Sequence, residues 1–199
     1  MRIVAFSDLH RDVEAALRIV EASKEADVVV GAGDFATFGE GASDTLRVLQ
    51  AIEAPMVLVF GNHDRPGELR SLCKDFHGAQ MLHGDTVRLG GVAFFGVGGE
   101  IPRRNAEPWS QAVSEEEARR LLQDCPKHAV LVTHTPPHGC ADLQKDGTHE
   151  GSRAIHAAIE EKHPILGLCG HIHFSWGASG KIGHSPVHNL GPTINRFEI

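Results

Sequence analysis

Short apolar runs alternate with amphipathic stretches over the first third of the chain, and this alternation restricts the fold more than any other feature. The runs at 2–6, 27–31 and 56–60 are short and contain valine, which is typical of buried strands. Between them, 13–24 has apolar residues at helical spacing, and 44–52 is also expected to be a helix. This β-α-β-α-β order predicts a parallel sheet covered by helices.

The remainder of the chain continues in shorter pieces. Gly90 and Gly91 predict a tight hairpin turn between two strands. Ser114 followed three residues later by Glu117 is a capping-box pattern, which predicts a helix that ends near Gln123. Further strands are expected at 80–82, 86–89, 92–97, 129–132, 165–169, 181–183, 187–190 and 194–199, and a further helix at 152–161.

The chain shows no internal repeat, low-complexity tract or linker, so we expect one domain over residues 1–199. The segment 136–151 has no periodicity and is predicted to be a long loop. Loops of this length inside a compact domain are often functional. We therefore expect this loop to form one wall of a substrate pocket.

Charge and hydropathy narrow the classes of partner. The formal net charge is −7 at pH 7, so the chain lacks the basic excess of most nucleic-acid-binding proteins, and no such partner is expected. No apolar run reaches the roughly 18 residues of a membrane span, and the N-terminus does not resemble a signal peptide. The four cysteines form no C-x-x-C pair and are expected to be reduced thiols, which predicts a cytoplasmic location.

Polar side chains cluster directly after the expected strands. In an open α/β sheet, ligands bind at the carboxyl ends of the strands, so these side chains are predicted to share one edge. The residues concerned are Asp8, His10, Asp34, Asn62, His63, Asp64, His134, His171 and His173.

The residue types in this cluster indicate metal binding. Imidazole, carboxylate and amide oxygen, without thiolate, suit zinc, iron, manganese or a similar ion. The spacing of Asp8 and His10, and of His171 and His173, would point each pair to one side of an extended chain. The set is too large for one tetrahedral site and fits two adjacent metals that share a carboxylate, an arrangement that can cleave a phosphate ester.

The motifs D-x-H, GD, GNHD, a lone histidine after a strand, and GHxH occur here in that order, from Asp8 to His173. Together they resemble the calcineurin-like metallophosphoesterase family, and most closely its small single-domain phosphodiesterase members. The stretch HTPPHGCAD followed by HEGS resembles a subgroup with H-x-P-P-x-G in this loop. Thr133 stands where the family commonly has glycine before the lone histidine, a departure that leaves the ligand itself in place.

The resemblance implies an α/β fold, a four-layer α/β/β/α sandwich with mixed sheets. It also implies two metal ions, with manganese, iron and zinc as candidates. The first would be held by Asp8, His10, Asp34 and His173. Asp34 would bridge to the second, which Asn62, His134 and His171 would complete. His63 would act as general acid over the leaving group, and a metal-bridging hydroxide would attack phosphorus.

Several further residues have two open interpretations. His138 and His149, in the long loop, are candidate substrate contacts together with Asn62. Arg103 and Arg104 could clamp a phosphate, although solvated loop charges are the commoner case. Trp109 and Trp176 either flank the site or pack. Outside the motifs, structural or surface positions are expected for His77, His83, His128, His156, His163, His184 and His188.

The leading hypothesis is a dinuclear metal-dependent phosphoesterase that hydrolyses a phosphodiester, with a cyclic nucleotide or another small phosphate ester as substrate. A phosphomonoesterase or protein phosphatase would use the same metal core and is the alternative. A non-catalytic scaffold is disfavoured because none of the ligand positions has been lost. The sequence leaves the oligomeric state, the substrate and the native metals open.

Overall fold

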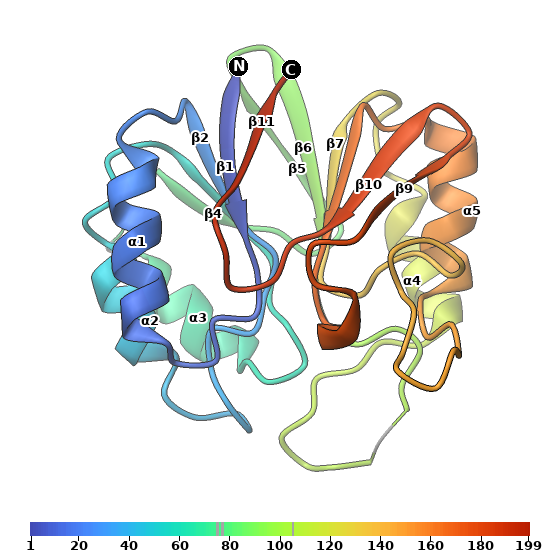
Figure 1. Ribbon diagram of the computed structural model, residues 1–199, viewed down its shortest axis with the longest axis horizontal. Coiled ribbons are helices and arrows are strands. Elements are labelled where there is room, and N and C mark those ends of the chain that lie inside the picture. The colour runs from blue at the N-terminus through green and yellow to red at the C-terminus, as the bar shows by residue number, and fades with distance from the viewer. Residues whose placement is uncertain (75, 77, 105) are drawn as a thin grey trace.

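Two mixed β-sheets pack face to face between two layers of helices in the computed structural model of the protein (Figure 1). The structure describes residues 1–74, 76, 78–104 and 106–199. The prediction for His77 lies outside the described residues.

The first sheet has the strand order β11-β1-β2-β3-β4, and its bounds are β1 (Arg2–Phe6), β2 (Val28–Gly31), β3 (Met56–Leu58), β4 (Ala79–Met81) and β11 (Asn195–Glu198). The strands β1 to β4 run parallel, whereas β11 returns antiparallel to β1. The connecting helices are α1 (Val13–Ser23), α2 (Ala42–Leu49) and α3 (Pro66–Cys73). The predicted parallel β-α-β-α-β unit is confirmed.

The second sheet has the order β5-β6-β7-β8-β10-β9, and its bounds are β5 (Asp85–Leu89), β6 (Val92–Val97), β7 (Val130–Thr133), β8 (Leu166–Cys169), β9 (Ser179–Ile182) and β10 (Ser185–Asn189). Its central strands β6, β7, β8 and β10 are parallel, and both edge strands are antiparallel. The helices α4 (Glu115–Leu122) and α5 (Arg153–Lys162) follow β6 and β7. Gly90 and Gly91 both have positive φ and form the predicted hairpin turn.

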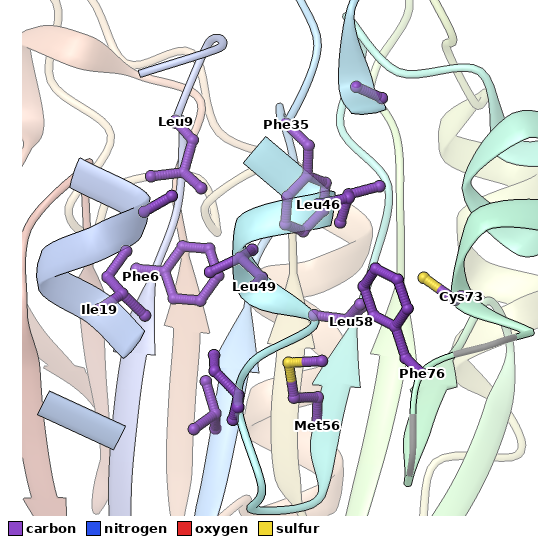
Figure 2. Close-up of a cluster of buried hydrophobic side chains, with 14 of the residues drawn as sticks. Phe6, Leu9, Ile19, Phe35, Leu46, Leu49, Met56, Leu58, Cys73 and Phe76 are labelled. Carbon is purple, nitrogen blue, oxygen red and sulfur yellow. The ribbon is translucent and has the colours of Figure 1, made fainter. Parts of the chain in front are cut away.

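Three buried apolar clusters separate the layers. One lies between the first sheet and helices α1 to α3, and Figure 2 shows Phe6, Phe35, Leu46 and Met56 within it. A second packs the other sheet against α4 and α5. A third contains alternate residues of strands from both sheets, such as Val30 of β2, and fills the space between the sheets. The four-layer α/β/β/α sandwich is therefore confirmed.

The polar loops gather at one edge of this sandwich. The segments after β1, β2 and β6, and the short 3₁₀ helix η1 (His173–Ser175) after β8, lie along the lower edge of Figure 1. This is the edge to which the parallel strands of each sheet direct their carboxyl ends. No helix in the described part of the chain is long and apolar enough to cross a membrane.

Some local structure differs from the sequence predictions. The helix α3 was not predicted, although Pro66 at its first position is a start signal. Its apolar face is small, since Leu69 and Cys73 are its buried residues. The helix expected at 44–52 instead spans Ala42–Leu49, and Gly41, in a left-handed conformation at the N-cap, marks its start.

Candidate metal centre

The candidate ligands sit on tightly turned backbone directly after the strands. Asp8, His10, Asp34 and His171 all have positive φ, between 43° and 69°. The interpretation that the i, i+2 pairs share a side of extended chain is therefore wrong. The loops turn back on themselves, and the backbone bonds from Asp8 N to Gly33 O and from His10 N to Asp34 O, each 2.9 Å, hold the first loop against the second.

Two glycines make this close approach possible. A side chain at Gly61 would collide with the carboxylate of Asp34, and one at Gly170 would collide with that of Asp8. Both positions therefore require glycine for reasons of space.

The first ligand cluster joins Asp8, His10, Asp34 and His173. The Nε2 atoms of His10 and His173 are 3.2 Å apart. Asp34 Oδ2 lies 3.5 Å from the Nε2 atom of His10, and Asp8 Oδ1 lies 3.8 Å from that of His173. Both carboxylates are buried, whereas His173 is half exposed, so the cluster opens to solvent on the His173 side.

The second ligand cluster shares Asp34 with the first. His134 Nε2 lies 3.5 Å from Asp34 Oδ2 and 3.0 Å from Asn62 Oδ1. The rings of His134 and His171 have centroids 5.0 Å apart. The structure thus brings together all seven sequence-predicted metal ligands, in two groups that meet at Asp34.

Both clusters have the donor chemistry of a cation site. The Nδ1 atoms of His10 and His134 contact the carbonyl oxygens of Ala36 and Ala32 at 3.2 Å and 2.8 Å. Each carbonyl accepts the Nδ1 proton and leaves the Nε2 lone pair free to face the carboxylate oxygens of Asp34. Lone pairs that converge in this way repel one another unless a cation or a proton lies between them. The residues therefore fit a pair of metal ions.

The carboxylates and imidazoles of the two clusters shift one another's pKa values because they lie close together. Burial raises the pKa of Asp34, but His134 and His10 outweigh it and lower the pKa overall. Burial lowers the pKa of His134, yet Asp34 and Asp8 raise it to about 9. A buried imidazole beside two carboxylates thus favours a positive charge, and a bound metal ion can supply that charge instead.

His63 lies beside the first cluster. Its ring centroid is 4.8 Å from that of His10, and its backbone N–H donates to Asp34 Oδ1 at 2.8 Å. The backbone N–H of Phe38 donates to His63 Nδ1 at 2.9 Å. Nδ1 is therefore an acceptor, and the neutral ring carries its proton on Nε2. Burial lowers the pKa of His63, and the Asp34 carboxylate only partly opposes this.

Asp64, the last residue of GNHD, has a structural role that was not assigned from the sequence. Its buried carboxylate accepts the backbone N–H groups of Asp34, Ala36 and Gly61 at 2.8, 2.8 and 2.7 Å. Burial and the nearby Asp34 carboxylate raise the pKa of Asp64 to about 7. Asp64 therefore ties the loop after β2 to the loop after β3 and fixes the backbone of Asp34, the candidate ligand common to both clusters.

Trp176 contacts two ligands of the first cluster at once. Its Nε1–H donates to Asp8 Oδ2 at 3.2 Å, and its ring lies 4.2 Å from that of His173 at an interplanar angle of 33°. The sequence left this residue open between flanking the site and packing. The structure places it at the first cluster, in a position to orient both side chains.

Glu100 was missed by sequence reasoning. It is buried, and its Oε1 lies 3.8 Å from His171 Nε2. Its Oε2 accepts the backbone N–H of Arg104 at 3.3 Å. Burial raises the pKa of Glu100. The only sequence signal was that Glu100 closely follows the expected strand at 92–97. The other candidate ligands were located by the same rule, because each of them follows an expected strand.

The long loop is organised around a buried carboxylate. Asp142 accepts a bond from His149 Nδ1 at 2.7 Å and from the backbone N–H groups of Gly139 and Gly151 at 3.0 and 2.8 Å. The rings of His138 and His149 have centroids 5.9 Å apart. In the described residues, no hydrogen bond or ring contact joins either histidine to a metal-ligand candidate, so substrate contact by them stays a prediction.

Arg104 links this loop to the segment after β6. Its guanidinium donates to the backbone carbonyl of Glu150. A phosphate clamp, the less favoured of the two interpretations of this pair, is therefore not preformed at Arg104, because its side chain is already bonded. Arg103 is exposed, as expected for a solvated loop charge.

Comparison with known proteins identifies the family and the fold. No curated protein matches the sequence. The fold resembles that of the protein TT1561 of Thermus thermophilus (TM-score 0.77, 21% identity, 99% of this chain and 98% of that chain). It also resembles a dimetal phosphatase from Danio rerio (TM-score 0.64, 13% identity, 96% and 88%) and an archaeal phosphodiesterase (TM-score 0.59, 15% identity, 100% and 93%). The sequence model of the calcineurin-like phosphoesterase superfamily domain matches residues 1–191, and the chain therefore belongs to this superfamily.

Proposed function

We propose that the protein is a two-metal phosphodiesterase for small phosphate esters. The observation that carries the proposal is the double role of Asp34. Its buried carboxylate belongs to one group of possible ligands with His10 and His63, and to another with Asp8 and His134. A carboxylate shared in this way is what a pair of adjacent metal ions requires.

The metal ligands divide as the resemblance implies, with Asp8, His10, Asp34 and His173 for one ion and Asp34, Asn62, His134 and His171 for the other. Bound cations in such a site supply an activated water nucleophile and neutralise charge that develops at phosphorus. The donor set suits manganese, iron or zinc.

His63 is proposed to donate its Nε2 proton toward the leaving oxygen. The bond from Phe38 N fixes the ring and its tautomer, so the donor is oriented before substrate arrives. Asn62 is buried with its Oδ1 toward His134, which keeps its side chain at the cluster for metal or substrate. His138 and His149 remain the proposed contacts to the outer part of the substrate.

The charge around the second cluster favours a diester over a monoester. A monoester is a dianion at neutral pH and needs more positive charge than a singly charged diester. Glu100 instead brings a carboxyl to within 3.8 Å of His171 Nε2, and Arg104 is bonded to the carbonyl of Glu150. The Glu100 carboxylate would oppose a second negative charge on the phosphate, and the Arg104 guanidinium is bonded to the Glu150 carbonyl instead of being free to pair with that charge.

We further propose that residues 1–199 act as one domain and that the protein works in the cytoplasm on a small-molecule substrate, without nucleic acid. Four buried cysteines without disulfides support the location, because reduced thiols are the rule in that compartment. The acidic net charge supports the small substrate over a long polyanion.

A substrate and metal screen tests the proposal. The purified protein is stripped of metal and reconstituted with manganese, iron, zinc or nickel. Each form is assayed on bis-p-nitrophenyl phosphate, p-nitrophenyl phosphate and cyclic nucleotides. We expect metal-dependent turnover with a higher kcat/KM for diesters. A higher kcat/KM for p-nitrophenyl phosphate with every metal would replace the proposal by a phosphomonoesterase.

A further inference from the structure

An aromatic wall stands on one side of the candidate metal centre. It consists of Phe38, His63 and Trp109. The ring centroids are 5.2 Å apart for Phe38 and His63, 5.0 Å for Phe38 and Trp109, and 4.5 Å for His63 and Trp109. His63 forms the inner end of the wall, because its ring also contacts His10. The wall therefore runs outward from the metal ligands toward solvent.

Phe38 is held in solvent by a backbone that a phenylalanine rarely adopts. Its φ is +53°, in the left-handed region, and 60% of the residue is exposed. Three interactions fix this conformation: Phe38 N donates to His63 Nδ1, Gly39 N donates to His63 O, and Thr37 and Glu40 pair with each other. Left-handed backbone at a bulky residue is costly and is found mainly at functional sites. The backbone conformation of the loop therefore holds the Phe38 ring in solvent.

The position of the wall specifies which part of a substrate would meet it. His63 is the proposed donor to the leaving oxygen, so a group attached to that oxygen would extend past His63 toward Phe38. The exposed ring offers an apolar, planar surface there. Such surfaces bind planar aromatic groups by stacking or edge contact, and the loss of one such contact weakens binding roughly ten-fold.

We propose that Phe38 and Trp109 form a subsite for a planar aromatic group carried by the leaving side of the substrate. The preferred substrates are then phosphodiesters whose leaving group bears a nucleobase or another aromatic ring. This inference rests on the proposed function, since it takes the metal centre as the place where phosphate binds.

Ligands that are not diesters test the subsite without any turnover of a diester. Calorimetry on the manganese-loaded protein compares two matched pairs, phenylphosphonate with methylphosphonate and adenosine monophosphate with ribose 5-phosphate. We expect the ring-bearing member of at least one pair to bind about ten-fold more tightly. The pair that shows the difference identifies the ring as aryl or nucleobase.

Variants of Phe38 test whether the aromatic wall causes the preference for ring-bearing ligands. Phe38→Ala should abolish the preference for the ring while methylphosphonate and ribose 5-phosphate bind as before. Phe38→Leu keeps apolar bulk without a ring and should lose most of the preference. The matched control is Phe174→Ala, because Phe174 is 58% exposed and lies outside the wall. It should keep the wild-type preference.

Two outcomes would overturn the inference, and they differ from failure of the proposed function. If methylphosphonate binds but neither pair shows a ring preference, the wall is no subsite, and the metal centre remains a phosphate site. The same holds if Phe38→Ala retains the full preference. If no phosphonate or phosphate binds the manganese-loaded protein, the proposed function fails and the inference fails with it.

Discussion

Asp64 offers the sharpest test of how the fold holds its shared ligand. Replacing it with alanine leaves three buried backbone N–H groups, of Asp34, Ala36 and Gly61, without their acceptor. Each unsatisfied buried donor costs about 1–3 kcal/mol. Removing the repulsion between the carboxylates of Asp64 and Asp34 offsets part of this. We therefore expect the free energy of unfolding to fall by about 3 kcal/mol for Asp64→Ala.

Asparagine retains an acceptor oxygen but turns an amide N–H₂ toward a backbone donor. The free energy of unfolding should therefore fall by about 1–2 kcal/mol for Asp64→Asn. A typical domain has about 5–15 kcal/mol of stability, so both variants should still fold. The control is Asp12→Ala, because Asp12 accepts one backbone N–H, that of Ala15 at 2.8 Å, at the N-cap of α1. It should cost about 1 kcal/mol.

Urea unfolding of the metal-free proteins measures these differences without the stabilisation that bound metal adds. The reasoning requires Asp64→Ala to be clearly more damaging than Asp12→Ala, because three bonds are lost against one. Equal losses in the two variants would refute the view that Asp64 clamps the loops together.

Three further predictions concern Trp176, His63 and Asp142. Trp176→Phe keeps a ring but loses the N–H bond to Asp8. The affinity for one metal ion should therefore fall about 10–100-fold, with the affinity for the other unchanged. A calorimetric titration in which both sites weaken alike, or neither weakens, would contradict this. His63→Ala should retain both metals and lose about 10²–10⁴-fold in kcat on esters with poor leaving groups, with a smaller loss on p-nitrophenyl esters; an equal loss across leaving groups would remove the proton-donor role. Burial raises the pKa of Asp142, but the bonds from His149 and two loop N–H groups lower it overall, so Asp142 stabilises the fold above its unfolded pKa of about 3.9 and loses that contribution as the pH falls through its folded pKa. The difference in unfolding free energy between wild type and Asp142→Asn should therefore shrink below about pH 4, and a difference that stays constant in urea unfolding across the acid range would show that the carboxylate charge is not involved.

The sequence was sufficient to place the candidate ligands at one edge. Strand ends can be located from short apolar runs, and the carboxyl ends of parallel strands meet at one edge of the sheet, where ligands bind. Asp34 and His134 are far apart in the chain, and each follows a buried strand of a different sheet. The family resemblance carried by the order of the motifs then implied the proposed division of ligands between two ions. These steps needed no knowledge of the loop backbone.

The contacts that orient the ligands could not be predicted in the same way. The bond from Trp176 Nε1 to Asp8 joins residues 168 positions apart, and it depends on how η1 folds back over the first loop. The three bonds to Asp64 depend on left-handed turns that a sequence pattern does not encode. Helix α3 was missed because its apolar face is too small to give a helical period.

The central claim is that Asp34 joins two metal sites in one centre, and elemental analysis of the reconstituted protein tests it most directly. Wild-type protein should hold two metal ions per chain. Asp34→Asn should weaken both sites, whereas His10→Ala should mainly weaken one. A wild-type protein that never exceeds one metal per chain after reconstitution, or an Asp34→Asn variant that holds two ions with wild-type affinity, would contradict the account.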